Sequence, residues 1–285
     1  MEISRRNALL SGLSASVVGL LAPEGSLSAH EGGDASGPGA DQTNILRHYV
    51  LATGNMEVLD RTLAELKEKL GLVSQPKKEL TELGFTNGIV VIGKTVLEVV
   101  APLAPGKRPH VEAFIKERGG PGLYKLVFQT FDAAALRKRI YAYKLKLERD
   151  QEFRGQQMIT LDPEMFGTSL EAFTYAPLEK WWGYDSAKTY VQSDLVEEVM
   201  GCDLVIENPG AVSTLVASMF NAELDPEAKT VRFQKNTTVP FDERTIRFVA
   251  PFDERRGVLT LDVKVKNRAR VGEKVTISGV DFRFV

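Results

Sequence analysis

Residues 45–53 are mostly apolar, with Leu46, His48, Val50 and Ala52 on one face of a strand, and apolar residues then recur at steps of three and four from Met56 to Leu70. The first pattern predicts a strand, and the longer steps predict an amphipathic helix that Gly71 ends. Two further strands follow a loop rich in proline and lysine. The predicted elements of this unit are at residues 45–53, 56–70, 86–92 and 94–101.

The same order of elements recurs directly afterwards. A polar residue lies within the first strand of each copy, His48 and then Tyr124, and a glutamate lies within the last strand, Glu98 and then Glu171. Because a carboxylate on an inward face is costly unless it is paired or bound to a cation, the two glutamates indicate a shared site. The elements of the second copy are predicted at residues 122–130, 132–150, 157–161 and 168–175.

Residues 177–285 repeat this pattern more weakly. A helix is expected over residues 209–220, but the helix between the last two strands is missing or much shortened. No histidine follows His110, and no pair equivalent to His48 and Glu98 is evident. We therefore predict that this half is a scaffold or a wall of the cavity. Its strands are expected at residues 204–207, 231–234, 245–249, 257–265 and 274–285.

The first 29 residues differ from the rest of the chain. Arg5 and Arg6 precede an apolar stretch at residues 8–22, and small residues close the segment. This pattern predicts an export signal of the twin-arginine type, with an ordinary secretory signal or an uncleaved tether as alternatives. Residues 30–44 are predicted to be a flexible linker. We expect a periplasmic or secreted protein with no stable membrane span after cleavage.

Composition narrows the chemistry. A hydrophobic content of 43% can form a substantial core, and a formal net charge of −2 without basic clusters argues against a nucleic-acid partner. The chain has one cysteine and three histidines, so any metal site must depend on carboxylates. His48, Glu98 and Glu171 are the candidate ligands, and a buried salt bridge is the alternative for each glutamate.

Residues 46–176 resemble the vicinal oxygen chelate superfamily, which includes glyoxalase I, extradiol dioxygenases and bleomycin-binding proteins. The resemblance implies an α+β fold in which paired βαβββ modules form a cupped mixed sheet around one metal, here followed by a second, more degenerate pair. It is carried by Leu46-Arg47-His48-Tyr49-Val50, Leu70-Gly71, Gly84-Phe85-Thr86-Asn87-Gly88, Leu97-Glu98-Val99-Val100, Gly119-Gly120-Pro121-Gly122-Leu123 and the stretch from Asp162-Pro163-Glu164 through Gly167 to Leu170-Glu171.

Carried over to this chain, the resemblance implies His48, Glu98, Tyr124 and Glu171 as the positions around the metal. Tyr124 departs from the usual pattern, because a neutral phenol is a poor ligand unless the metal recruits the phenolate. One imidazole and two carboxylates suit Mn²⁺, Fe²⁺, Co²⁺, Ni²⁺ or Zn²⁺. A dioxygenase is less favoured, since its iron site needs a second histidine.

The function expected from these residues is that of an exported, metal-dependent isomerase or lyase of the glyoxalase type. It would act on a small organic molecule that presents two oxygens to the metal, with Glu171 as base and Tyr124 as a further catalytic group. The alternatives are a protein that binds or sequesters a small molecule without turnover, and a degenerate scaffold. Both modules lie in one chain, so a monomer or a homodimer could form the site.

Overall fold

The structure is a computed structural model that describes residues 44–174, 193–233 and 243–285. The predicted signal, nearly all of the predicted linker and the predicted domain boundary at residues 176–177 lie outside these ranges. Among the described residues, no helix is long and apolar enough to cross a membrane.

The first module begins with β1 and ends with β4. Asn55 begins α2 by accepting a 2.9 Å hydrogen bond from the Val58 amide, and Gly71 ends it in the left-handed conformation. One face of α2 is buried through Leu59, Leu66 and Leu70. The elements are β1 (Ile45–Ala52), α2 (Met56–Leu70), β2 (Lys78–Leu80), the 3₁₀ turn Thr81–Leu83, β3 (Phe85–Ile92) and β4 (Thr95–Pro102).

The second module corrects one sequence prediction. The helix expected to reach residue 150 ends at Ala142, and a separate helix with His110 in its first turn precedes the module. Residues 147–153 are polar except at their two ends, but they pair with the next strand, so tertiary context decides their conformation. The elements are α3 (Pro109–Arg118), β5 (Gly122–Thr130), α4 (Ala133–Ala142), β6 (Leu147–Phe153), β7 (Gln156–Leu161), the 3₁₀ turn Pro163–Met165 and β8 (Ser169–Thr174).

The second half repeats the arrangement in reduced form, as expected. Between β13 and β14 the chain makes only a 3₁₀ turn at Arg268–Arg270, where the other modules carry a helix. The elements are β9 (Val196–Val205), α5 (Pro209–Phe220), β10 (Glu223–Asp225), β11 (Thr230–Phe233), β12 (Arg244–Val249), β13 (Gly257–Val265), β14 (Lys274–Ile277) and β15 (Val280–Phe284).

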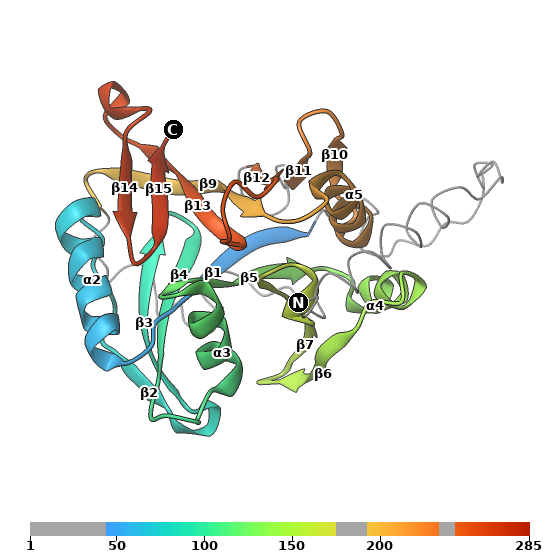
Figure 1. Cartoon of the computed structure of the whole chain (residues 1–285), viewed down its shortest axis with the longest axis horizontal. Coiled ribbons are helices and arrows are strands. Elements are labelled where there is room, and N and C mark those ends of the chain that lie inside the picture. The colour runs from blue at the N-terminus through green and yellow to red at the C-terminus, as the bar shows by residue number, and fades with distance from the viewer. Residues whose placement is uncertain (1–43, 175–192, 234–242) are drawn as a thin grey trace, which may run out of the picture.

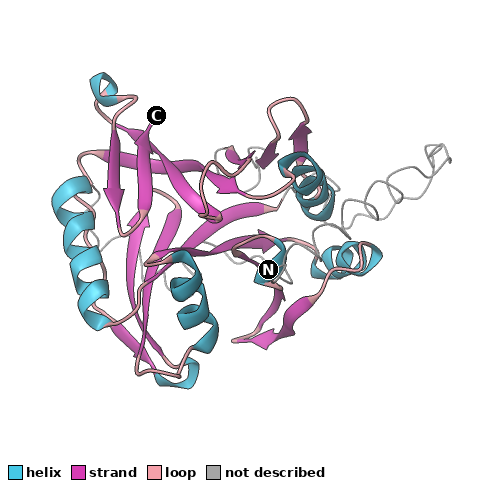
Figure 2. Cartoon of the chain, in the orientation of Figure 1, coloured by secondary structure: helices cyan, strands magenta, loops and turns pink. Residues whose placement is uncertain are grey.

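The strands of the described residues join into one 15-stranded mixed sheet, whose main path runs β10-β11-β12-β9-β13-β5-β1-β4-β3-β2. The two halves meet where β13 pairs with β5 (Figure 1). Helices lie outside the sheet, and α4 and α5 lie side by side (Figure 2). The larger hydrophobic core extends through both halves, while a smaller cluster lies around the pocket of the first half. The predicted fold class, α+β with paired βαβββ modules, is therefore confirmed.

Candidate functional site

The first strands of the two modules, β1 and β5, pair antiparallel around a local two-fold axis. Tyr49 lies opposite Leu126 on the axis, with His48 opposite Val127 and Val50 opposite Lys125. The register shifts once on each strand, so Arg47 and Tyr124 have no direct partner in this ladder. Such bulges interrupt the alternation of side chains between the two faces.

This register identifies Lys125, rather than Tyr124, as the counterpart of His48. On the last strands, Glu98 of β4 lies beside Val50, and Glu171 of β8 lies beside Val127. His48 lies two residues before Val50, the neighbour of Glu98, and Lys125 lies two residues before Val127, the neighbour of Glu171. The sequence prediction was one residue off because alternation alone does not locate a bulge.

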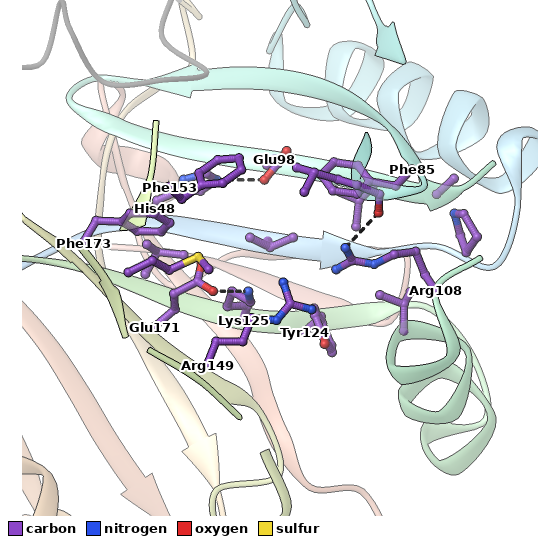
Figure 3. A pocket seen from close by; sticks show the side chains of 18 of the residues that line it. His48, Phe85, Glu98, Arg108, Tyr124, Lys125, Arg149, Phe153, Glu171 and Phe173 are labelled. Atoms are coloured by element: carbon purple, nitrogen blue, oxygen red, sulfur yellow. Dashed lines mark hydrogen bonds and ion pairs between the residues drawn. The ribbon is translucent and has the colours of Figure 1, made fainter. Parts of the chain in front are cut away.

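These side chains line a cavity of about 110 Å³ between the two modules (Figure 3). All four predicted site residues border it, so the structure brings together the residues that the sequence singled out. Its polar lining is His48, Glu98, Arg108, Tyr124, Lys125, Arg149, Gln151 and Glu171, and its apolar lining includes Val50, Phe85, Val100, Val111, Val127, Phe153, Met158 and Phe173.

In the first module, His48 and Glu98 form a buried pair. His48 Nε2 lies 3.4 Å from Glu98 Oε2, and the Asn87 amide donates a 2.6 Å hydrogen bond to Glu98 Oε1. Burial raises the pKa of Glu98, but His48, Asn87 and the charge of Lys125 together outweigh it, so the pKa lies below its ordinary value. Glu98 is therefore a carboxylate at neutral pH.

In the second module, Lys125 and Glu171 form an ion pair. Lys125 Nζ donates a 2.5 Å hydrogen bond to Glu171 Oε2, which also accepts one of 2.8 Å from the Thr160 hydroxyl. The side chains of Lys125 and Glu171 are 14% and 5% exposed. The ion pair is thus nearly closed off by protein, and its opening is toward the cavity that both residues line.

Tyr124 contributes a phenol to the cavity and an edge contact to Phe114, with ring centroids 5.3 Å apart. Burial raises the pKa of Tyr124, and the nearby Lys125 charge opposes this without reversing it. Its ordinary state here is the neutral phenol, which can donate a hydrogen bond. The tyrosinate that a metal ligand at this position would require is disfavoured.

Two arginines complete the polar lining, and Figure 3 shows both reaching into the pocket. Arg108 donates to the Leu83 carbonyl at 3.0 Å and lies over the Phe85 ring. Arg149 lies 3.6 Å from Glu148. Sequence reasoning missed both arginines, along with Asn87 and Thr160, because they lie outside the strands on which the repeat was recognised, or on strands without a glutamate.

The donor set does not fit a metal held by the three predicted ligands. The Lys125 ammonium lies against Glu171, and an ammonium has no lone pair to offer a metal. Within the described ranges, no group of three or more His, Cys, Asp or Glu side chains is placed to hold an ion. Metal binding by these residues therefore stays a prediction from the sequence.

The second half carries a different polar cluster at the equivalent positions. The β9–β13 ladder has the same arrangement, centred on Cys202 and Leu261. By register, Arg247 of β12 and Arg283 of β15 take the places of Glu98 and Glu171. Each arginine lies within salt-bridge distance of both Asp203 and Asp262. Sequence reasoning did not identify this cluster, which contains no counterpart of the His48 and Glu98 pair.

A hypothetical protein from Staphylococcus aureus shares this fold, with a TM-score of 0.59 at 14% identity, over 85% of this chain and 99% of that one. The chain is also similar to methylmalonyl-CoA epimerase from Mycobacterium tuberculosis, at 20% identity and a TM-score of 0.38, over 46% of this chain and 88% of that one. A hypothetical protein from Bacillus halodurans matches at 20% identity with a TM-score of 0.40, over 47% of this chain and 96% of that one.

No curated protein sequence matches the chain significantly. Residues 46–163 match the family model of the glyoxalase-like domain. This segment contains β1, β4 and β5 with His48, Glu98 and Lys125, and it stops short of Glu171. The match shows that this part of the chain is similar to the glyoxalase-like domain family.

Proposed function

We propose that this protein is an enzyme of the isomerase or lyase type, which moves a proton on a carbon next to a carbonyl or carboxylate group. The observation that carries the proposal is the pair of buried glutamates, Glu98 and Glu171, which reach one small cavity from equivalent strands. Buried carboxylates beside an apolar pocket are suited to proton transfer with carbon acids.

Glu171 is the proposed base that takes the proton from substrate carbon. The protonated Glu171 can then return the proton to the same carbon or to a neighbouring one, which gives exchange or isomerisation, while the Glu98 carboxylate faces the cavity from the other module. Loss of a leaving group instead of the second proton transfer gives a lyase reaction. The neutral phenol of Tyr124 can donate a hydrogen bond to an oxygen of the substrate.

The proposed substrate is a small organic anion with adjacent oxygen atoms. Three cationic side chains, Arg108, Lys125 and Arg149, line the cavity beside two carboxylates. The arginines can bind a carboxylate through paired N–H donors. A substrate that fills the cavity displaces its water, and the apolar walls then strengthen these interactions. A cavity of this size admits a molecule of a few heavy atoms, or the reactive end of a longer one.

The test is exchange of carbon-bound hydrogen with solvent. We expect proton NMR in D₂O to show loss of the signal next to the carboxylate or carbonyl in at least one compound of a panel of 2-hydroxy, 2-oxo and malonyl-type acids. Glu171→Gln removes the proposed base, and general-base catalysis typically contributes 10²–10⁴-fold, so exchange should slow by about that factor. Glu68→Gln, on the exposed face of α2, is the matched control and should exchange at the wild-type rate.

Two results would contradict the proposal. Exchange that is equally fast in Glu171→Gln would remove Glu171 from the reaction. Binding of panel members, measured by calorimetry, without exchange of any of them would instead favour the alternative of a small-molecule binding protein.

We also propose that the protein acts outside the cytoplasm, on the evidence of the Arg5-Arg6 pair and the apolar stretch after it. Replacing Arg5 and Arg6 together by lysine should retain the full chain in the cytoplasmic fraction of the host cell. Equal export of this variant and the wild type would contradict a twin-arginine signal and leave an ordinary secretory signal as the alternative.

A further inference from the structure

We propose that Lys125 takes the place of a metal ion in this cavity: its ammonium group binds an oxygen of the substrate and compensates the negative charge that forms there. This inference rests on the proposed proton transfer and names the group that makes it possible. Lys125 is then a catalytic residue, because it touches the atoms that react.

The position of Lys125 in the two-fold arrangement of the strands supports this role. Lys125 is the two-fold counterpart of His48, and its ammonium lies against Glu171 in the way that His48 lies against Glu98. A cation therefore already occupies the space in which a metal would contact Glu171. Because the ammonium has three N–H donors and Glu171 accepts from one, donors remain for an oxygen in the cavity.

The movement of charge during the reaction also supports a role for Lys125. Before proton transfer, the Lys125 charge is balanced by the Glu171 carboxylate. The C–H bond then breaks, the proton passes to a Glu171 oxygen, and the electron pair forms a carbon–carbon double bond while the carbonyl oxygen becomes an enolate. Glu171 is now neutral, so the charge of Lys125 is available to the enolate oxygen. No oxidant, reductant or additional co-reactant enters this balance.

The second half of the same chain contains a related cluster of charged side chains. There the positions of Glu98 and Glu171 are arginines, and each is ion-paired to the aspartates of the two central strands. This fold therefore already holds a cluster of carboxylates with side-chain cations at the corresponding place. In the first half Lys125 likewise places a side-chain cation beside a carboxylate, but it also lines an open cavity.

The decisive experiment is binding of Co²⁺, followed by its visible absorption, in the purified full chain and in variants. We expect no stoichiometric binding in the wild type. Lys125→His replaces the ammonium with an imidazole and should bind one equivalent, which His48→Ala in the same background should abolish. Lys125→Gln, a second variant that frees Glu171, should also bind, and thermal unfolding checks that both variants are folded.

The second arm measures binding of malonate, a small dicarboxylate, by calorimetry in the presence of EDTA. We expect the wild type to bind and the neutral double variant Lys125→Gln/Glu171→Gln to bind at least tenfold more weakly. Lys138→Gln, an exposed lysine of α4, is the matched control and should bind like the wild type.

Three results would overturn the inference: one equivalent of Co²⁺ bound by the wild type and lost in His48→Ala, no Co²⁺ bound by either lysine variant, or malonate binding that is absent from the wild type or unchanged in the double variant. Failure here is distinguishable from failure of the proposed function. Proton exchange that requires Co²⁺ would retain the proton transfer and remove Lys125 from its role. Expected Co²⁺ results without any exchange would do the reverse.

Discussion

Removing the charge of Lys125 should destabilise the protein, because Glu171 would be left as a buried carboxylate. Breaking a buried ion pair by removing one partner typically costs about 3–5 kcal/mol. Here Glu171 keeps the hydrogen bond from Thr160, and the pair borders a cavity that water can enter, so we expect about 2–4 kcal/mol for Lys125→Met. That is a large part of the stability of a typical domain, about 5–15 kcal/mol.

The partner variant should cost less. In Glu171→Gln the ammonium of Lys125, which is 14% exposed, can move toward the cavity, and we expect about 1–2 kcal/mol. The double variant Lys125→Met/Glu171→Gln contains no unpaired charge and should be within about 1 kcal/mol of the wild type. The two single losses then exceed the double loss by about 2 kcal/mol or more, which is the coupling between the groups.

Urea unfolding followed by circular dichroism measures all four free energies. The exposed pair of Lys69 and Glu65 on α2 is the matched control, because an i,i+4 surface pair contributes only about 0.3–0.5 kcal/mol. A Lys125→Met variant within 0.5 kcal/mol of the wild type would refute the reasoning, since it would mean that Glu171 needs no compensating charge.

Three further predictions concern the rest of the molecule. Phe128→Ala should lower the free energy of unfolding in urea by about 3–5 kcal/mol, because Phe128 is fully buried and stacks on Phe220 of the second half with ring centroids 4.1 Å apart. A loss under 1 kcal/mol would contradict a core shared by the two halves. Burial raises the pKa of the Cys202 thiol, so Ellman's reagent should label it only after unfolding; rapid labelling of the native protein would refute this. Burial acts to raise the pKa of Asp162, but Lys146 and the hydrogen bond from the Glu164 amide together outweigh it, so the net shift is downward. The stabilisation is therefore present above the ordinary value of 3.8 and is lost as the pH falls through the folded-state pKa. The difference in unfolding free energy between the wild type and Asp162→Asn should therefore shrink from pH 7 to pH 3, and a constant difference would contradict it.

The strands that carry the site could be predicted from the sequence because each is a short, mostly apolar run, which is typical of a strand buried on both faces. The strands of His48, Glu98 and Glu171 were all located within one or two residues, and all three side chains reach the same cavity. The repeat supplied the rest of that inference, since equivalent positions in paired modules come together.

What could not be predicted depends on features without a local pattern. The bulge at Tyr124 shifts the alternation by one residue, and nothing in the neighbouring sequence identifies it, so Lys125 was missed. The pattern of residues 147–153 predicts the end of a helix instead of the observed strand, because leucine, glutamate, arginine and glutamine are all good helix formers. Arg149 lies on that strand and was missed with it.

The contrast between the two halves explains why the first half carries the proposed activity. In the second half each of Asp203 and Asp262 has two arginine partners, with N–O distances from 2.6 to 3.1 Å. Such a network satisfies its own charges, and arginine stays protonated, so the cluster has little to offer a ligand.

In the first half each glutamate has one basic partner, His48 for Glu98 and Lys125 for Glu171, and both pairs border a cavity. A carboxylate with a single ion partner can exchange that partner for a proton, which the doubly paired aspartates of the second half resist. The strand positions of Glu98 and Glu171 are thus occupied by Arg247 and Arg283 in the second half, where they serve stability instead of the proposed proton transfer. The difference lies in how completely the charges are paired, rather than in the fold.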